Sequence, residues 1–558
     1  MAMRFSDLHC HNHMRAHFWM QEQRKRFERK GEFSPWTVIA SNRKGYLKGK
    51  MGASYSQTDL VKAWNGNLRL TFNSLYPLEK PFVKGFKPKV GDDKWTRFLI
   101  AFATSHKLPF RDFIQTMYMR IPDDAVDYFQ STAYDYWDSL NREMRFVTKD
   151  SGKRIKRNEV FTPGLARRIF ESEKKRRNNF PREMLATNAC YHIPKTPKDL
   201  RASVEDDSEI TMVLTIEGSH ALGTDRASIA EVSRRVQYIK NEWPIPVFFI
   251  TFAHHFDNKL CGHAHSIPDQ GKALLDQSAN LNAGFNDNGR RILREFLGLN
   301  KKLERDSKYG YRILIDVKHM SAKSRKEYYE EFVIPCMEKE DVIPVIGSHC
   351  GYSGRKTLEE HISLQDSERD EYTELCGDES HLSETERKQL IKNQPLGKFN
   401  AWNINLCDED IRMIVKTKGL FGLSFDQRIL GITDKDKDSK RNGIQLLWEN
   451  IEGIVKSAYS NEDFTEEEKL QVWQCITIGT DLEGLIDPVS PYPTVLEFEV
   501  FAGNLIFEIE ESRKNLELSY LSHLTSIDDV RKCVEDFCFN NAAAFVKKHY
   551  PSKESMEQ

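Results

Sequence analysis

Five short runs of apolar residues along the chain each end in residues that bind divalent metals. Runs of this kind, rich in Val, Ile and Leu and separated by helical stretches, predict strands of a parallel sheet that is buried on both faces. The runs are MRFSDLHCH, TMVLTIEG, YRILIDVKH, VIPVIGSH and CITIGTD, and the metal-binding residues at their ends are His9, His11, Glu217, His319, His349 and Asp481.

The ends of these runs indicate one shared metal site. When parallel strands close into a barrel, all their carboxyl ends open onto the same face, where barrel enzymes carry their chemistry. The six residues would meet on that face even though the first and the last, His9 and Asp481, lie far apart in the sequence. The sequence therefore predicts one polynuclear metal site.

The first run gives the spacing of the ligands a physical basis. Residues i and i+2 of a strand share a face, so His9 and His11 can hold one ion while Leu8 and Cys10 pack behind them. His13 continues the same register, but it follows the apolar run and is expected in a loop.

Other segments predict strands and helices that carry no candidate metal ligands. NLRLTFNSLYP alternates apolar and polar residues and predicts a second strand. Helical periodicity extends from Asp93 to about Asn179, and FWMQEQRKRFERKG predicts a basic helix. The stretch after His349 is polar and acidic, which predicts an exposed helical insertion.

The charge is balanced over the whole chain but unevenly distributed. The sequence holds 82 Lys and Arg residues against 83 Asp and Glu residues. From Arg15 to Arg201, about 38 basic residues stand against about 20 acidic ones. This asymmetry could steer an anionic substrate or dock one part of the molecule onto another, and solvated helix faces would produce it equally well.

Nothing in the pattern predicts a membrane span. The longest apolar stretch, near PVFFITFA, is far shorter than the roughly 20 residues that a span needs. The first predicted strand begins almost at Met1, which leaves no room for a signal peptide before His9. The ten cysteines form no CxxC pair, as expected of free thiols in a reducing compartment. We expect a soluble, cytoplasmic protein without membrane contact.

The order and local wording of the motifs resemble the membrane (renal) dipeptidase family of binuclear zinc hydrolases, in the amidohydrolase superfamily. SDLHCH resembles the first metal motif of that family, and LTIEGSHAL resembles the segment of its bridging glutamate. FITFAHHFDN resembles the strand whose histidine contacts substrate. The remaining similar segments are NLRLTFNSLYP, GFNDNGRRILREF, ILIDVKHMS, IPVIGSH, TIGTDLEG and the closing helix SIDDVRKCVEDFCFNNAAAFVKKHY.

The resemblance implies an α/β fold, a (β/α)8 TIM barrel of the metal-dependent hydrolase type. The chain departs from the family in two segments that are longer than the family needs, 81–206 and 350–398, and we expect these to be large, mainly helical insertions that can act as lids. The expected divisions are the start of the barrel at 1–80 with a basic helical or loop insertion at 14–56, a basic, mainly helical insertion or lid at 81–206, barrel at 207–349, an acidic helical insertion at 350–398, the barrel end and closing helix at 399–550, and a disordered tail at 551–558.

The resemblance also implies the chemistry. Two divalent ions, most favourably zinc, would share Glu217, with His9, His11 and Asp481 around one ion and His319 and His349 around the other. A hydroxide bridging the two ions would attack an amide or peptide bond of a small substrate. Asp481 would shuttle the proton to the leaving amine, and His254, or its neighbour His255, would stabilise the oxyanion.

Two residues depart from the pattern of that family. His11 stands where the family usually has Asp, which could change metal preference because imidazole is softer than carboxylate. Ile404 stands where the family has an arginine that binds the substrate carboxylate, and an apolar side chain cannot form that pair. We therefore expect ordinary dipeptides to be poor substrates. Candidate substrate contacts are Tyr76, His254, His255 and Arg355, with Lys356 and Arg428 as other possible substitutes for the arginine.

Two alternatives stay open at this point. TatD-type deoxyribonucleases share the ligand order of HxH, Glu, His, His and Asp, and the basic N-terminal third would suit a phosphate backbone. GFNDNGRR, IDVKHMS and the closing helix resemble the dipeptidases more closely than that class. The barrel could also be a module for a protein partner or a homodimer. In that hypothesis the aromatic helices between Trp95 and Phe146, with Tyr118, Tyr128, Tyr134, Tyr136 and Trp137, form the interface rather than core.

Overall fold

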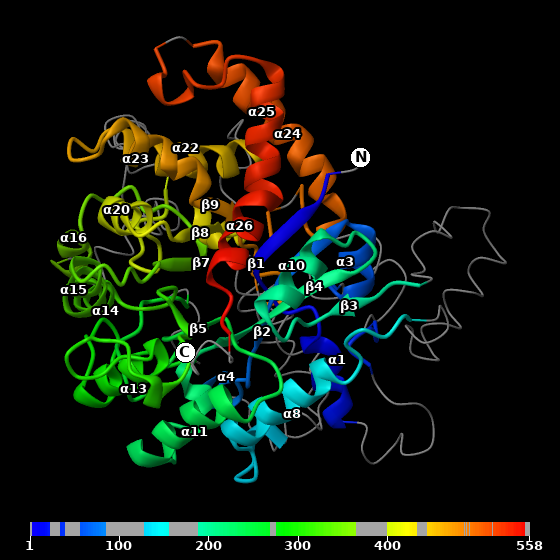
Figure 1. Ribbon diagram of the computed structural model, residues 1–558, viewed down its shortest axis with the longest axis vertical. Coiled ribbons are helices and arrows are strands. Elements are labelled where there is room, and N and C mark those ends of the chain that lie inside the picture. Colours follow the sequence, from blue (N-terminus) through cyan, green and yellow to red (C-terminus); the bar gives the residue numbers. More distant parts are fainter. Residues whose placement is uncertain are drawn as a thin grey trace, which may run out of the picture.

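Eight parallel strands form the centre of the molecule in the computed structural model, and each pairs with the next around the sheet (Figure 1). A two-residue strand, β3 (Tyr191–His192), adds to β4. The eight strands are β1 (Phe5–Cys10), β2 (Leu68–Leu75), β4 (Ile210–Glu217), β5 (Phe249–Thr251), β6 (Leu314–Asp316), β7 (Ile346–Cys350), β8 (Leu420–Leu423) and β9 (Ile476–Ile478).

The structure describes most of the chain. Its residues are 3–22, 34–38, 56–84, 128–155, 188–267, 275–363, 399–431, 443–515 apart from 485, 487 and 490, and 517–552.

The first and last strands close the sheet into a barrel. Just past the end of β9, the backbone N–H of Asp481 donates to the carbonyl of His9 (2.9 Å), and that of His11 donates to Leu482 (3.1 Å). Asp7 of β1 accepts from the backbone N–H and the hydroxyl of Thr480, at 2.8 and 2.5 Å. The predicted (β/α)8 barrel is therefore the observed fold.

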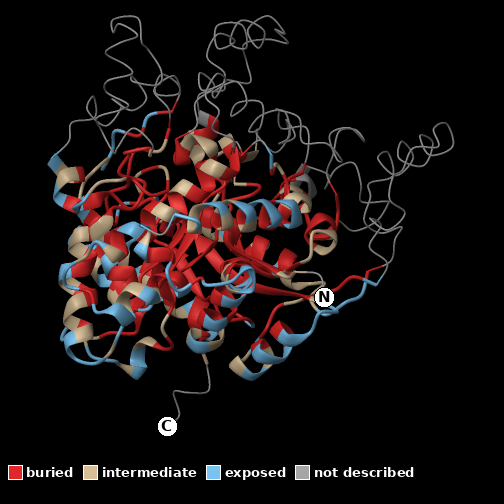
Figure 2. Ribbon diagram, turned by 90° about the horizontal axis from the view of Figure 1, so that it is seen from above, coloured by how far each residue is buried: buried red, intermediate tan, exposed pale blue. Residues whose placement is uncertain are grey.

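Helices surround the strands, with their apolar faces on the barrel and exposed residues outward (Figures 1 and 2). The helices of the first half are α1 (Met14–Glu22), α3 (Leu60–Asn65), α4 (Lys80–Lys84), α8 (Tyr136–Thr148), α10 (Pro197–Glu205), α11 (Ile229–Asn241) and α13 (Asp287–Leu297). Those of the second half are α14 (Ala322–Tyr328), α15 (Ile334–Glu338), α16 (Leu358–Ser363), α20 (Asp408–Lys416), α21 (Gln427–Leu430), α22 (Gly443–Tyr459), α23 (Glu466–Gln471), α24 (Phe498–Arg513), α25 (Ile527–Glu535) and α26 (Asn541–His549).

The inside of the barrel is apolar at its amino end. Leu8, Phe72, Phe249 and Leu420 come from four different strands and are buried in one cluster with Phe545 of α26. Helix α26 therefore closes this end, as expected of the predicted closing helix. The opposite end, where the strands finish, is left for polar side chains.

Most of the predicted elements are confirmed where the structure describes them. Each of the five metal-binding runs contains a strand, and NLRLTFNSLYP contains β2. Strand β8 and the short β3 were not singled out by the pattern. Of the helical stretch predicted from 93 to 179, α8 is described, whereas 85–127 and 156–187 lie outside the described residues. The same holds for 364–398 of the acidic insertion, for 23–31 of the basic helix and for 553–558 of the tail.

The aromatic residues near α8 belong to the core rather than to an open interface. Tyr134 and Tyr136 are buried, and Phe146 is buried as well. The cluster of Tyr134 and Tyr136 includes Phe82 and Phe256, and Tyr128 packs against it partly buried. Trp137 is also partly buried and packs against the main core. Trp95 and Tyr118 lie outside the described residues.

Candidate metal centre

His9 and His11 meet Glu217 at the carboxyl end of the barrel. Nε2 of His9 lies 3.1 Å from Oε1 of Glu217, and Nε2 of His11 lies 3.1 Å from Oε2. Both rings are completely buried. Cys10 is buried with its Sγ at Oγ1 of Thr71, as the strand register predicts. The prediction for Leu8 is wrong: Leu8 packs in the apolar cluster inside the barrel, because the pairing of β1 with β2 shifts its register between Asp7 and Cys10.

His319, His349 and Asp481 complete the group. Nε2 of His319 lies 3.2 Å from Nε2 of His349, which lies 3.9 Å from Oε1 of Glu217. Oδ1 of Asp481 lies 3.8 Å from Nε2 of His9. The structure thus brings together all six predicted ligands.

These six residues form two overlapping sets of possible ligands. One set is His9, His11, Glu217 and Asp481, and the other is Glu217, His319 and His349. Within each set, one donor atom from every residue lies within 4.8 Å of the others. Glu217 belongs to both sets and is placed to bridge them.

The hydrogen bonds behind two of the rings set the direction of their lone pairs. Nδ1 of His11 faces the carbonyl of Ser74 at 3.0 Å, so it must carry the proton. Nδ1 of His349 faces Oγ of Ser348 at 2.7 Å, and this hydroxyl donates to Oδ2 of Asp316 at 2.6 Å. Ser348 therefore accepts the Nδ1 proton. In both rings Nε2 presents a lone pair to the centre, as metal-binding histidines do.

Polar atoms without partners show that this donor set fits a cation. Nε2 of His9 and of His11 are buried and make no hydrogen bond within the described residues. Buried polar atoms are normally satisfied, so orphaned lone pairs that converge on a carboxylate suit a metal ion.

Burial favours neutral imidazoles at His9, His319 and His349, whereas at His11 burial is outweighed by the charges of Glu217 and Asp481, which raise its pKa. Burial lowers the pKa of His319 and of His349 well below the ordinary value. Burial and the charge of Glu217 raise the pKa of Asp481 well above its usual range. Burial opposes ionisation of Glu217, but the attraction of His254 and of His9 outweighs it and lowers the pKa of Glu217.

His254 lies beside this cluster on the loop after β5 and is held by Glu79. Nδ1 of His254 is hydrogen-bonded to Oε2 of Glu79, and its Nε2 lies 3.3 Å from Oε1 of Glu217. Burial opposes both charges, but their attraction raises the pKa of His254 to about 10 and lowers the pKa of Glu79 to about 2. The contact with Glu79 therefore favours the protonated, hydrogen-bond-donating form of His254.

Backbone strain is concentrated in the same place. His319 and Asp481 have left-handed backbones, with φ of 64° and 65°, and Glu483 has φ of 70°. Such conformations are costly in non-glycine residues and collect at functional sites. The carboxylate of Glu483 accepts hydrogen bonds from Arg15 and from the hydroxyl of Ser56. These two contacts hold the loop that carries Asp481.

The predicted substrate contacts divide into two groups. The ring centroid of Tyr76 lies 4.9 Å from that of His254, and the ring of His255 lies 4.1 Å from that of His254. Both therefore lie at the centre. Arg355 is half-buried on the loop after β7, and among the described residues it makes no hydrogen bond or ion pair with the cluster.

The alternative cations are engaged elsewhere. Arg428 forms a two-pronged ion pair with Asp426, its Nη2 lying 2.6 Å from Oδ2. Lys356 pairs with Asp408 at 2.8 Å on the surface. Ile404 is buried against Ala264 and Trp402, and the backbone N–H of Ala264 donates to the carbonyl of His319 (2.8 Å). An apolar wall thus lies next to the centre.

His13 does not join the metal cluster, as its expected loop position implied. Its Nε2 lies 2.7 Å from Glu143 of α8, and its Nδ1 contacts Asn73. Sequence patterns also missed Glu79 and Lys318. Lys318 is buried beside His319, and its Nζ has no hydrogen-bond partner among the described residues. Only its position next to a ligand could have drawn attention to it.

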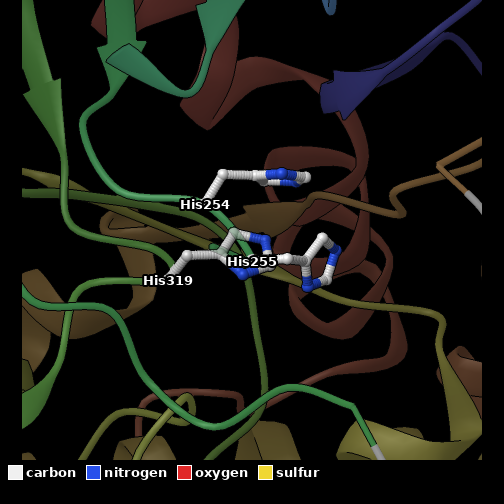
Figure 3. Close-up of side chains that lie close together, drawn as sticks. All are labelled: His254, His255 and His319. Carbon is white, nitrogen blue, oxygen red and sulfur yellow. The ribbon is translucent and has the colours of Figure 1, made fainter. Parts of the chain in front are cut away.

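A third group of histidines lies against the centre. The rings of His254, His255 and His319 lie close together at neighbouring strand ends (Figure 3). The ring centroids of His255 and His319 lie 4.8 Å apart.

No family model matches the chain, and no curated protein matches its sequence. Solved structures do show similarity. A metallo peptidase from Rhodobacter sphaeroides, liganded with a phosphinate mimic of the dipeptide L-Ala-D-Ala, has 12% identity and a TM-score of 0.46, covering 99% of this chain and 100% of the other. The dipeptidase AC, a metallo peptidase, has 11% identity and a TM-score of 0.46, covering 99% of each chain.

The probable dipeptidase PvdM from Pseudomonas aeruginosa has 12% identity and a TM-score of 0.41, covering 95% of this chain and 98% of the other. No helix among the described residues is both long and apolar enough to cross a membrane.

Proposed function

We propose that this protein is a binuclear metal-dependent hydrolase that cleaves an amide or peptide bond in a small substrate. The observation that carries the proposal is the pair of overlapping ligand sets that share Glu217. Nitrogen and oxygen donors in this combination suit zinc. His9, His11 and Asp481 would hold one ion, and His319 and His349 the other.

Divalent ions bound there would supply Lewis acidity, which lowers the pKa of water and polarises a carbonyl group. Asp481 would take the proton of the attacking water and pass it to the nitrogen of the leaving amine as the carbon–nitrogen bond breaks. His254, held protonated by Glu79, would donate a hydrogen bond to the oxygen that gains negative charge. Tyr76 would line the substrate beside His254.

The substrate end that lies near Ile404 would be uncharged. The side chain of Ile404 is buried in an apolar cluster with Ala264 and Trp402, and Arg428 is paired with Asp426. An unusual peptide or an acylated amine suits such a wall better than a free carboxylate does.

A cytoplasmic location belongs to the same proposal. The nine cysteines in the described residues are all free thiols, which suits a reducing compartment.

Metal content and hydrolysis test the proposal together. Protein purified with zinc should hold about two ions per chain, measured by elemental analysis. Wild type and Asp481→Asn are then compared on dipeptides, N-acyl amino acids and single-stranded DNA. We expect amide hydrolysis by the wild type and a loss of about 10³-fold or more in Asp481→Asn.

Two results would contradict the proposal. Less than one ion per chain would exclude a binuclear centre. Cleavage of DNA without amide hydrolysis would favour the nuclease alternative, to which the basic N-terminal third lends itself.

A further inference from the structure

His255 is part of a cluster of three imidazoles that no step of the proposed reaction uses as a whole. It is half-buried, and one ring nitrogen from each of His254, His255 and His319 lies within 4.8 Å of the others (Figure 3). Such a cluster has two readings: a third metal position, or a set of hydrogen-bond donors. The position of the proton on His255 decides between them.

Gln277 begins the chain of hydrogen bonds that fixes this proton. Its amide faces the backbone N–H groups of Ser266 and Ile267 at 3.3 and 3.0 Å. These groups can only donate, so the atom they face is the amide oxygen, Oε1. The amide nitrogen of Gln277 must then donate to the carbonyl of His255 (2.6 Å) and to Oγ of Ser266 (2.8 Å).

Ser266 passes this direction on to the ring. Its Oγ accepts from Gln277, and its other recorded partner is Nδ1 of His255 at 2.6 Å. The arrangement that gives every group a partner sends the serine proton to Nδ1. A ring nitrogen that accepts a hydrogen bond holds a lone pair, so neutral His255 carries its proton on Nε2.

At His349 the hydrogen bond between a serine hydroxyl and Nδ1 runs in the opposite direction. There Ser348 donates to the carboxylate of Asp316, so it must accept from Nδ1 and leave a lone pair on Nε2. Ser266 accepts from an amide N–H and Ser348 donates to a carboxylate, so the rings of His255 and His349 have opposite tautomers. His349 presents a metal ligand, whereas His255 presents an N–H donor.

We propose that His255 is a further substrate-binding residue, which donates a hydrogen bond through Nε2–H to a substrate oxygen beside His254. Ser266 and Gln277 are its positioning residues, and the cluster of three histidines does not hold a metal ion. The ligand group is a carbonyl oxygen that becomes negatively charged during the reaction. This role rests on the proposed hydrolase function, but the tautomer itself does not.

The tautomer can be measured without any activity. Nitrogen-15 NMR of the ring nitrogens in deuterated, histidine-labelled, zinc-loaded protein should show His255 neutral, with its proton on Nε2, assigned by loss of its signals in His255→Gln. A proton on Nδ1 would overturn the proposal. Direct coupling of a His255 nitrogen to cadmium-113, in protein loaded with that ion, would also overturn it.

Kinetics test the donor role in the wild-type enzyme with its best amide substrate. Leucine removes the donor, whereas the glutamine amide places an N–H near the position of Nε2. We expect His255→Leu to lower kcat about 10²-fold while KM changes little, and His255→Gln to recover at least about tenfold of that loss. Both variants should keep the metal content of the wild type.

Loss of metal in His255→Leu, or equal activity of the two variants, would overturn the donor role. If the wild type hydrolyses no amide in any metal form, the proposed function fails. The NMR result then still decides the state of His255.

Discussion

Asp481 has a strained backbone, and its carboxylate occupies the space that a side chain at position 484 would need. Its φ is 65°, and that of Glu483 is 70°. A Cβ atom on Gly484 would overlap Oδ1 of Asp481. Glycine is therefore required at 484 to leave room for the carboxylate, whereas Glu483 anchors the loop through Arg15.

We expect Gly484→Ala to displace the Asp481 carboxylate and to weaken metal binding about 10- to 100-fold. Metal titration followed by calorimetry measures this directly. Gly503→Ala is the matched control, because a Cβ at that position in α24 meets nothing within 4 Å. The control should bind metal as the wild type does and gain about 0.5–1 kcal/mol of stability. Equal metal affinity in both variants would contradict this account of Gly484.

His17 gives the molecule a pH-dependent stability away from the centre. Both of its ring nitrogens are buried without a hydrogen-bond partner in the described part of the chain. Burial lowers the pKa of His17 from 6.5 to about 4. Between these values the unfolded chain binds a proton that the folded chain does not, so the free energy of unfolding falls as the pH falls.

We expect the wild type to lose about 2 kcal/mol through His17 between about pH 7.5 and about pH 5. His17→Phe, which keeps an aromatic ring beside Phe146, should lack this component. Denaturant unfolding of both proteins at the two pH values, in the absence of metal, gives the difference. An identical pH dependence in both would show that His17 is not the group responsible.

At the scale of elements, one buried ion pair joins α14 to α20 behind the metal centre. Nε of Arg325 lies 2.9 Å from Oδ1 of Asp410, and both side chains are fully buried. The guanidinium also donates to the carbonyls of Met320 and Asn403, at 2.9 and 2.6 Å. It thereby ties the segment after His319 to the segment that carries Ile404.

We expect Arg325→Met to lower the free energy of unfolding by about 3–5 kcal/mol, because it leaves a buried carboxylate without its partner. Lys326→Met, which breaks the neighbouring exposed pair with Glu359, should cost less than about 1 kcal/mol. Chemical denaturation of the two variants makes the comparison. Similar losses in both variants would mean that burial does not determine how much the Arg325–Asp410 ion pair contributes to the free energy of unfolding.

Strands were predictable from sequence where an apolar run was long, as in β2, or ended in a metal-binding residue. Strand β9 has only three residues but its run ends in Asp481, whereas β8, LFGL, has four residues and ends in no ligand. Without such an end, a run this short looks the same in a strand, a helix or a loop. The place of β8 in the barrel is fixed by pairing with β7 and β9, which are distant in sequence.

The six clustered residues were predictable because each follows a strand and each is a metal-binding type. The residues that orient them were not. Glu79 lies 175 positions before His254, and Gln277 lies 22 positions after His255 and acts through the hydroxyl of Ser266. Such partners follow no local period, because only tertiary packing brings them together.

At the scale of the whole molecule, metal and stability should be linked. A ligand that binds only the folded state stabilises it by about 2.7 kcal/mol at a free concentration 100 times its Kd. We therefore expect zinc to raise Tm and a chelator to lower it. The shift should shrink in Asp481→Asn, which removes a carboxylate charge from the cluster. Calorimetry measures Tm. A Tm that changes neither with zinc nor with a chelator would contradict a metal site at this centre.

The contact between β1 and the end of β9 also affects when the protein can bind metal during its synthesis on the ribosome. Of the two residues proposed to share an ion, His9 emerges early in synthesis, and its partner Asp481 emerges only after 471 other residues have followed. Until β9 docks on β1, the nascent chain can offer only part of that ligand set. Metal uptake would therefore report the last step of assembly, and a ribosome-bound fragment that stops before β9 should acquire the ion poorly.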